Sequence, residues 1–172
     1  MGRLHNSGFD LFGAVYEMFA SNKEKSDFGE FFTRRHYTHV FTKLLLINEK
    51  SFNDEEFKIL DPACGTGGFL TEAFKILKNN YYKTNTLNDN SIEFLEENCF
   101  FGYDVKEENV SRSRLNMFLV GDGHTHISKK DTLRNKHLKD SFDYIVTNPP
   151  YGNGNIEAET SVISTKRYLY LF

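Results

Sequence analysis

The residues that follow one apolar run near the end of the chain could hold a planar amino group. The run 142–147 stops at Asn148, and Pro149 and Pro150 come next. Proline fixes φ and has no backbone N–H, so this pair must end a strand. The carboxamide oxygen of Asn148 and a proline carbonyl are then two rigidly held acceptors for the hydrogens of an amine. Tyr151 can stack on the ring that carries this amine.

An amine held in this way keeps its nitrogen lone pair available for attack on an electrophile. Such catalysis depends on positioning, and no strong base is needed if the electrophile is a sulfonium methyl group. Taken alone, the same stretch also fits a simpler interpretation, in which prolines end a strand and Asn148 is a cap.

A glycine-rich stretch is the second candidate for chemistry. It begins at Asp61 and reads Asp-Pro-Ala-Cys-Gly-Thr-Gly-Gly-Phe over 61–69. Glycines let the backbone turn tightly and approach a ligand, and the helix N-terminus that follows suits an anionic or carboxylate group. Asp61 could accept a hydrogen bond from a ligand amine. The glycine spacing differs from that of the dinucleotide-binding fingerprint, so a plain turn between strand and helix stays open.

Two more acidic residues follow apolar runs. Asp104 occupies the position where nucleotide-binding sheets hold the two ribose hydroxyls, although it lies about 40 residues after the glycine turn rather than the usual ~20. Alone, Asp104 is better explained as a cap of the next helix, and Asp131 could equally be a cap or a turn residue. Because parallel strands end at the same edge of a sheet, the agreement of Asp61, Asp104, Asp131 and Asn148 favours one shared site.

The elements that must position these residues alternate along the chain. Apolar runs near 57–61, 99–105, 126–133 and 142–150 predict strands, and helices are predicted over 67–79, 91–98 and 106–121. Strands that alternate with helices indicate an α/β fold with a parallel sheet and right-handed crossovers. The predicted helix that follows the glycine turn should bury one face, made of Phe69, Leu70, Ala73, Phe74 and Leu77.

The first 48 residues read as helical. Apolar residues at helical spacing predict one helix over 9–20. A second helix is predicted from about Thr38, with Val40, Leu44 and Ile47 on its apolar face.

Composition excludes several classes of protein. The chain has 172 residues, 39% of them hydrophobic and 26% charged, which predicts a soluble globular protein. No apolar run approaches the ~20 residues that cross a bilayer. The two cysteines, Cys64 and Cys99, make no disulfide framework, so a reducing, cytoplasmic location is expected. A net charge of -3 argues against a strong nucleic-acid-binding surface on this chain alone.

Two further groups of residues have simple explanations. His124 and His126 lack the additional ligands that a metal site needs, so no metal is predicted. A set of basic residues near the third predicted strand is expected to be a solvated face, with contact to the DNA backbone as the alternative. This set is Lys129, Lys130, Arg134, Lys136 and Lys139.

Six motifs together carry a resemblance to a known family. They are GEFFTRR (29–35), DPACGTGGF (61–69), GYDV (102–105), NMFLVGDG (116–123), KKDTL (129–133) and NPPYG (148–152). The chain resembles amino-methylating DNA methyltransferases that use S-adenosylmethionine. In particular, it is similar to the N-terminal and catalytic part of the modification (M) subunit of type I restriction–modification systems. The order of the motifs resembles the γ arrangement of these enzymes.

The resemblance implies a fold and a set of partners. The expected fold is a Rossmann-like methyltransferase domain with strand order 3-2-1-4, over 49–172, preceded by a helical segment over 1–48. The expected reaction methylates the N6 amine of a DNA adenine that is flipped out of the duplex. The expected partners are DNA and the specificity and restriction subunits, and no membrane is involved.

The resemblance also assigns a role to each matching residue. Glu30, Phe31, Phe32 and Thr33 would line the methionine end of the cofactor, with Thr33 at its carboxylate. The cofactor turn would consist of Asp61, Ala63, Gly65, Thr66 and Gly67. Asp104 would bind the ribose, and Asp131 would lie near the cofactor adenine. The residues that hold the target adenine would be Asn148, Pro149, Pro150 and Tyr151.

The chain departs from the family pattern in two places. Arg34 stands where the family usually has proline, and it could contact a phosphate or the cofactor carboxylate. The last residues, 164–172, resemble the start of the helix that leads to a fifth strand. A truncated chain is therefore expected, with the fourth strand as an apolar edge and no measurable methylation by this chain alone.

Three other functions remain open. A protein-glutamine methyltransferase also grips a planar amide with an NPPY motif, but it has no GEFFT-like segment. An RNA-amine methyltransferase is a weaker version of the same alternative. The third is a remnant that binds cofactor poorly or only binds other subunits.

Overall fold

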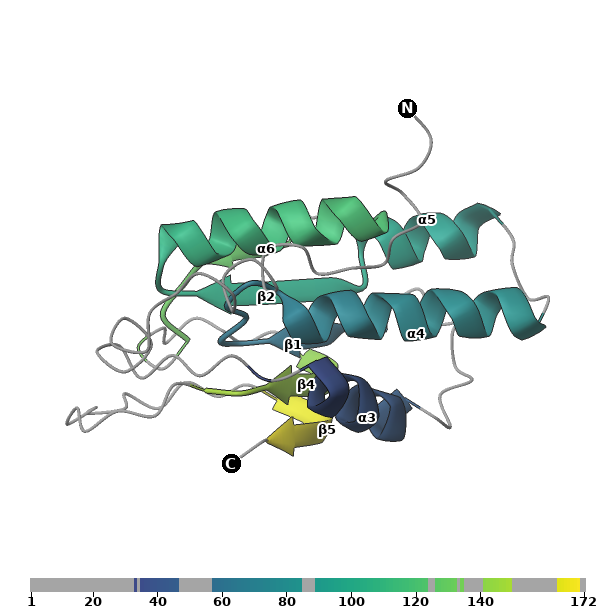
Figure 1. Ribbon diagram of the computed structural model, residues 1–172, viewed down its shortest axis with the longest axis horizontal. Helices are drawn as coiled ribbons and strands as arrows, with labels where there is room; N and C mark the ends of the chain where they lie inside the picture. The colour runs from purple at the N-terminus through teal and green to yellow at the C-terminus, as the bar shows by residue number, and fades with distance from the viewer. Residues whose placement is uncertain are drawn as a thin grey trace.

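The computed structural model describes residues 33, 35–46, 57–84, 89–123, 126–132, 134, 141–149 and 164–170. The described elements follow one another along the chain in the order α3-β1-α4-α5-β2-α6-β3-β4-β5 (Figure 1). The strands are β1 (Ile59–Asp61), β2 (Phe100–Asp104), β3 (Ile127–Lys129), β4 (Ser141–Thr147) and β5 (Ser164–Tyr170). The helices are α3 (Arg35–Leu46), α4 (Gly68–Thr84), α5 (Asp89–Glu97) and α6 (Glu107–Val120).

The described strands form one parallel sheet with the order β3-β2-β1-β4-β5. The predicted order of the first four strands is therefore confirmed. Strand β1 lies at the centre, with Asp61 opposite Gly102 of β2 and Leu60 opposite Ile145 of β4. Because the strands are parallel, the residues that follow β1, β2, β3 and β4 all lie at the carboxyl end of the sheet.

Strand β5 corrects the prediction for the last residues. The segment Ser164–Tyr170 was expected to begin a helix, and β4 was expected to be an exposed edge. Instead this segment is a strand that pairs with β4 from Ser141–Ser164 to Thr147–Tyr170. The composition of the segment, with one threonine and two tyrosines beside lysine, arginine and leucine, suits a strand as well as a helix. The strand is favoured because it pairs backbone groups of β4 that an edge would leave exposed.

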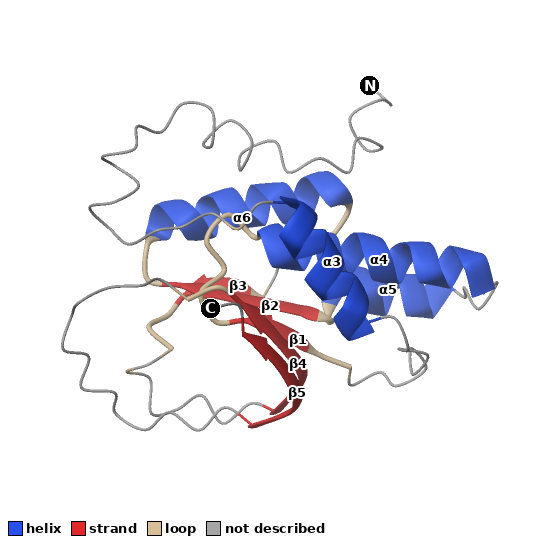
Figure 2. Cartoon of the chain, turned by 60° about the horizontal axis from the view of Figure 1, so that its bottom comes forward, coloured by secondary structure: helices blue, strands red, loops and turns tan. Residues whose placement is uncertain are grey.

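The described helices lie together on one face of the sheet (Figure 2). Residues from α3, α4, α5 and α6 share one apolar cluster with Ile59, Phe100 and Tyr144 of the sheet. The predicted buried face of α4 is confirmed, because its five residues are all at most 4% exposed. Those residues are Phe69, Leu70, Ala73, Phe74 and Leu77.

The other face of the sheet is also apolar and buried. Leu60, Tyr103, Phe142 and Ile145 form a second cluster there, each at most 4% exposed, with Phe101 packed against it. Strands β1, β2 and β4 are therefore buried on both faces, as is usual for parallel sheets, and this explains why their sequences read as nearly continuous apolar runs.

Helix α3 turns a different face inward from the one predicted. It begins at Arg35, three residues before the predicted start, and ends at Leu46. Val40 and Leu44 are 50% and 62% exposed, whereas Thr38, Thr42 and Leu46 are buried. The predicted apolar face is thus wrong for Val40 and Leu44. Ile47 and the predicted helix over 9–20 lie outside the described residues.

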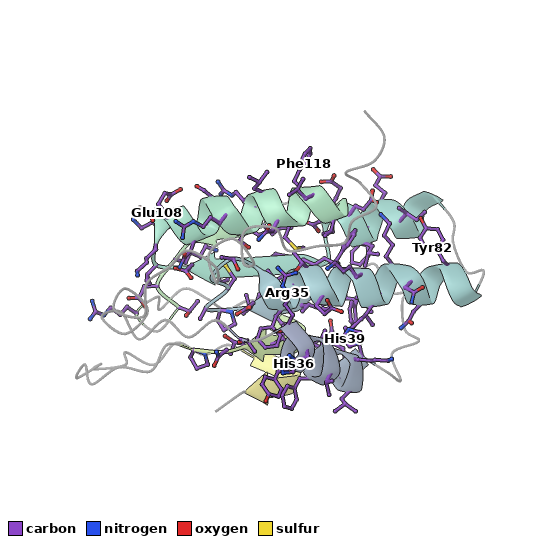
Figure 3. All side chains as sticks on the ribbon, viewed as in Figure 1. Arg35, His36, His39, Tyr82, Glu108 and Phe118 are labelled. Atoms are coloured by element: carbon purple, nitrogen blue, oxygen red, sulfur yellow. The ribbon has the colours of Figure 1, made fainter. Side chains whose placement is uncertain are left out.

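Contacts with α4 explain the orientation of α3. Figure 3 shows His39 on the side of α3 that faces α4, and its Nδ1 lies 2.6 Å from Oε1 of Glu72. The buried face of α3 consists of Thr38, Thr42 and Leu46. Within the described residues, no helix is long and apolar enough to cross a membrane.

Candidate active site at the carboxyl edge of the sheet

The glycine-rich turn after β1 is held by short backbone hydrogen bonds. The N–H of Gly67 donates to the carbonyl of Cys64 over 2.7 Å, and the N–H of Cys64 donates to the carbonyl of Tyr103 in β2 over 2.9 Å. Gly65 and Gly67 have φ values of 53° and 81°, which favour glycine. A Cβ atom on Gly67 would lie 2.5 Å from Oγ of Ser113, so the turn also packs tightly against α6.

Asp61 is a buried carboxyl group at the end of β1. It is 2% exposed, and its Oδ1 accepts a hydrogen bond from the N–H of Ala63 over 3.1 Å. Burial raises the pKa of Asp61 to about 7; the hydrogen bond from Ala63 and the nearby Thr147 hydroxyl offset part of this rise. A cationic amine placed beside this carboxyl would favour its ionised form, so the residue is suited to bind an ammonium group.

Asp104 connects the glycine turn to the start of α6. Its Oδ2 accepts from the N–H of Gly65 over 3.0 Å, and its Oδ1 accepts from the N–H of Lys106 over 2.8 Å. The side-chain amide of Asn109 lies 3.3 Å from each of these oxygens. Asp104 is therefore not the cap of α6, because the N-cap is Lys106 and has no side-chain cap hydrogen bond. Asp104 instead ties the residue before that helix to the glycine turn. A ribose at Asp104 would compete with the longer contacts from Asn109.

A row of polar residues on α6 contacts the glycine turn. No role for these residues was predicted from the sequence. Asn109, Ser113 and Asn116 are buried and lie at i, i+4 and i+7, on the face of α6 that meets the turn. Asn116 donates to the carbonyl of Thr66 over 2.9 Å. Phe118 instead projects from α6 away from the sheet (Figure 3) and is 53% exposed. The sequence signal that could have revealed these residues was three small polar side chains at i, i+4 and i+7 of a predicted helix.

The loop after β3 is tied to the same turn. Thr132 donates from Oγ1 to the carbonyl of Pro62 over 3.1 Å, which brings Asp131 to the tip of β1. The carboxylate of Asp131 accepts from the N–H of Arg134 over 3.2 Å and lies 3.7 Å from its Nε. Asp131 is therefore a turn residue, which agrees with one of its two interpretations. It also lies at the carboxyl end of the strands, as predicted.

Asn148, the first residue after β4, contacts the segment that carries the GEFFT motif. Its Nδ2 donates to Oγ1 of Thr33 over 3.0 Å, across 115 positions of sequence. This hydrogen bond joins the first and last of the six motifs at one point. The structure thus brings Asp61, Gly65 and Asp104 together around the turn, and Thr33 together with Asn148 at the neighbouring strand tip.

Several predicted site residues lie outside the described part of the chain. They are Glu30, Phe31, Phe32, Pro150 and Tyr151, together with Arg34. Ala63 and Thr66 lie in the glycine turn, where the N–H of Ala63 donates to Asp61 and the carbonyl of Thr66 accepts from Asn116. Pro149 is exposed beside Asn148.

The two cysteines and His126 have structural environments. Cys64 and Cys99 are both free and buried, and burial raises the pKa of each thiol, which disfavours the reactive thiolate. The ring of His126 stacks on Phe101 with centroids 4.4 Å apart, and His124 lies outside the described residues. The described residues contain no group of three or more metal-ligating side chains.

The basic set is only partly described. Lys130 lies with its Nζ 4.2 Å from the centre of the Tyr103 ring, and Arg134 pairs with Asp131. Lys136 and Lys139 lie outside the described residues, so contact of this set with DNA stays a prediction.

Comparison with known proteins identifies the family. The sequence model of N-6 DNA Methylase matches residues 7–171. The chain belongs to this family. It is 34% identical over 146 residues to the type I restriction enzyme EcoEI methylase subunit of Escherichia coli, with 83% of this chain covered. It is 28% identical over 151 residues to the type II restriction enzyme and methyltransferase RM.BcgI of Heyndrickxia coagulans, with 85% covered.

A solved structure of the type I restriction–modification system shares the fold of this N-6 DNA methylase chain. The TM-score is 0.62 at 27% identity, and the match covers 89% of this chain and 31% of the other. The predicted Rossmann-like methyltransferase fold and the predicted family are therefore confirmed. The chain spans only 28% of the EcoEI subunit and 22% of RM.BcgI.

Proposed function

We propose that this chain carries the cofactor-binding and amine-holding part of an adenine-N6 DNA methyltransferase. The methyl donor would be S-adenosylmethionine, and the acceptor would be the amine of an adenine flipped out of DNA. The observation that carries the proposal is the position of Asn148 and Pro149. They follow β4, which pairs directly with β1, and the tip of β1 leads into the glycine turn. An amine held at one tip would thus face a methyl donor held at the next.

The residues of the turn have the chemistry that the cofactor needs. Asp61 offers a buried carboxyl group to the ammonium of the methionine end. Asp104 offers a carboxylate to the ribose hydroxyls, and Asp131 would lie near the adenine ring. Thr33 would lie at the methionine carboxylate, in the segment 30–33. When bound, the cofactor supplies an electrophilic methyl group, and the chain contributes by binding, orienting and excluding water.

The amine would be held by two acceptors. The carboxamide oxygen of Asn148 and the carbonyl of Pro149 would accept its two hydrogens, and Tyr151 would stack on the base. Flipping the adenine out of the duplex makes its amine accessible. By similarity to type I subunits, the other partners would be the specificity and restriction subunits.

Calorimetry with S-adenosylmethionine tests the cofactor site. We expect the wild-type chain to bind, Asp61→Asn to bind at least tenfold more weakly, and Glu108→Gln to match the wild type. Glu108 is a suitable control because it makes the same acid-to-amide change on an exposed surface, 81% accessible. Absence of binding by folded wild-type chain would reject the cofactor site.

A labelled methyl group tests the acceptor. The chain, alone and with specificity subunit added, would be incubated with tritiated S-adenosylmethionine and DNA that lacks methylated bases. We expect no measurable label with the chain alone, and label in N6-methyladenine after digestion once the specificity subunit is added. Asn148→Ala should abolish that label, and Asn79→Ala should not. Asn79 is an exposed asparagine near the far end of α4. Label in N4-methylcytosine, in RNA or on a glutamine of a release factor would reject adenine as the acceptor.

A further inference from the structure

We infer that Thr33 is a positioning residue that fixes which atom of the Asn148 side chain faces the substrate amine. The inference rests on the proposed function, because it concerns the asparagine that would hold the adenine. It goes beyond that function by giving the Thr33 hydroxyl a second role, separate from its expected contact with the cofactor carboxylate.

The argument begins with the two ends of a carboxamide. The oxygen accepts hydrogen bonds and the nitrogen donates them, so only one of the two orientations can accept a hydrogen from an amine. The two orientations differ only by a half turn about the last side-chain bond, and they have nearly the same shape. Without a specific neighbour, Asn148 could present its nitrogen to the substrate and repel it.

Thr33 supplies that neighbour. Its Oγ1 accepts from Nδ2 of Asn148 over 3.0 Å, so the nitrogen end of the carboxamide is directed at Thr33. The oxygen end must then point about 120° away from it, because both atoms share one planar carbon. A hydroxyl oxygen can accept this hydrogen bond and still donate its own proton elsewhere, so both roles of Thr33 are chemically compatible.

Thr33 can fix Asn148 only if Thr33 itself is held. It lies two positions before Arg35, where α3 begins. Helix α3 is attached to α4 by the contact between His39 and Glu72, and α4 begins directly after the glycine turn. The hydroxyl is therefore positioned by the same helical layer that positions the cofactor turn. A contact confined to a loose terminal segment could not impose an orientation on Asn148.

Nuclear magnetic resonance can test the contact without any activity. Asparagine would be labelled with ¹⁵N, and the side-chain amide of Asn148 would be identified by its loss in Asn148→Ala. In the wild type, we expect these protons to exchange with water about fivefold more slowly than those of exposed Asn79, the effect of one hydrogen bond worth about 1 kcal/mol. We expect Thr33→Val to remove this protection and Thr33→Ser, which keeps the hydroxyl, to retain it.

This first measurement can overturn the inference in two ways. Exchange in the wild type as fast as that of Asn79 would show that the contact is not maintained, and this result needs no variant to fold. Unchanged protection in Thr33→Val would show that another group holds the carboxamide.

Binding of a short oligonucleotide tests the consequence for the base. The chain would be saturated with S-adenosylhomocysteine, which removes effects on cofactor affinity, and titrated with single-stranded hexamers of deoxyadenosine or deoxythymidine. We expect a preference for deoxyadenosine in the wild type and in Thr33→Ser. We expect Thr33→Val to lower the ratio of the affinities for the deoxyadenosine and deoxythymidine hexamers about fivefold.

The outcomes separate the inference from the proposed function. If the wild type prefers deoxyadenosine and Thr33→Val retains the full preference, the positioning role is rejected and the proposed function stands. If the wild type shows no preference although Asn148 is protected, the adenine clamp fails, and the positioning role fails with it.

Discussion

Single residues in this site differ in how firmly the protein holds them. Asp61 is buried and accepts one backbone N–H, from Ala63. Asp104 is held by two backbone N–H groups and by Asn109. Asp61 therefore retains acceptor capacity for a cationic ligand, whereas Asp104 is chiefly an organiser of the turn that a ribose would share.

Gly67 should tolerate a side chain much less well than Gly65. Both have positive φ, so alanine at either position costs about 1 kcal/mol in strain. At Gly67 the added Cβ would also meet Oγ of Ser113 at 2.5 Å, whereas at Gly65 nothing lies within 4 Å. We expect denaturant unfolding to show a loss of about 1 kcal/mol for Gly65→Ala and about 2–4 kcal/mol for Gly67→Ala.

A double variant identifies the cause of the larger loss. Adding Ser113→Ala to Gly67→Ala removes the hydroxyl and should recover part of the lost free energy of unfolding. No recovery would mean that the collision with Ser113 is not the source.

At the scale of elements, α6 acts as a support for the turn rather than only as an apolar cover for the sheet. Asn116→Leu keeps the size of the side chain but leaves the carbonyl of Thr66 without its hydrogen bond. We expect this change to lower the free energy of unfolding by about 1–3 kcal/mol and to weaken cofactor binding. Phe118→Leu, on the exposed side of the same helix, should change neither quantity by more than about 0.5 kcal/mol. Equal effects of the two substitutions would contradict the supporting role.

The orientation of α3 gives a second prediction at this scale. Leu46 is fully buried, whereas Leu44 is 62% exposed. The sequence pattern had placed Leu44 on the buried face. Thermal or denaturant unfolding should show a loss of about 2–5 kcal/mol for Leu46→Ala and less than about 0.5 kcal/mol for Leu44→Ala. A large loss at Leu44 would show that another surface covers this face of α3.

At the scale of the whole molecule, Asp61 makes stability depend on pH. The unfolded chain ionises this group near 3.8, whereas the folded chain does so near 7. Between these values the folded state binds the extra proton, so the contribution of Asp61 to the free energy of unfolding falls as pH rises and is constant above about 7.

The variant Asp61→Asn isolates that contribution. We expect it to resemble the wild type in stability at pH 4 and to exceed it increasingly up to pH 7, by on the order of 4 kcal/mol. Unfolding by urea at several pH values measures the difference. A difference that does not grow with pH would mean that burial does not raise the pKa of Asp61. Greater stability with lost cofactor binding would mark Asp61 as a residue whose function costs stability.

Much of the fold, and the candidate residues that follow the strands, could be predicted from the sequence. Apolar runs alternate with helical periodicity, and this local pattern is enough to indicate a parallel sheet. The order 3-2-1-4 came from the resemblance to the family. Asp61, Asp104, Asp131 and Asn148 follow those runs directly, so their common edge follows from the topology alone. The buried face of α4 was also predictable, because its apolar residues share one helical stripe.

Other features depended on contacts between residues that are distant in sequence. The face that α3 buries depends on α4, since a helix with apolar residues on two sides cannot reveal locally which side meets a neighbour. The strand Ser164–Tyr170 depends on pairing with β4, which local propensity did not favour over a helix. The hydrogen bond between Thr33 and Asn148 spans 115 positions. The sequence by itself determined which residues reach the edge of the sheet, because order along a strand is local. Only the tertiary structure decided which of them touch, because that depends on how helices and strands pack.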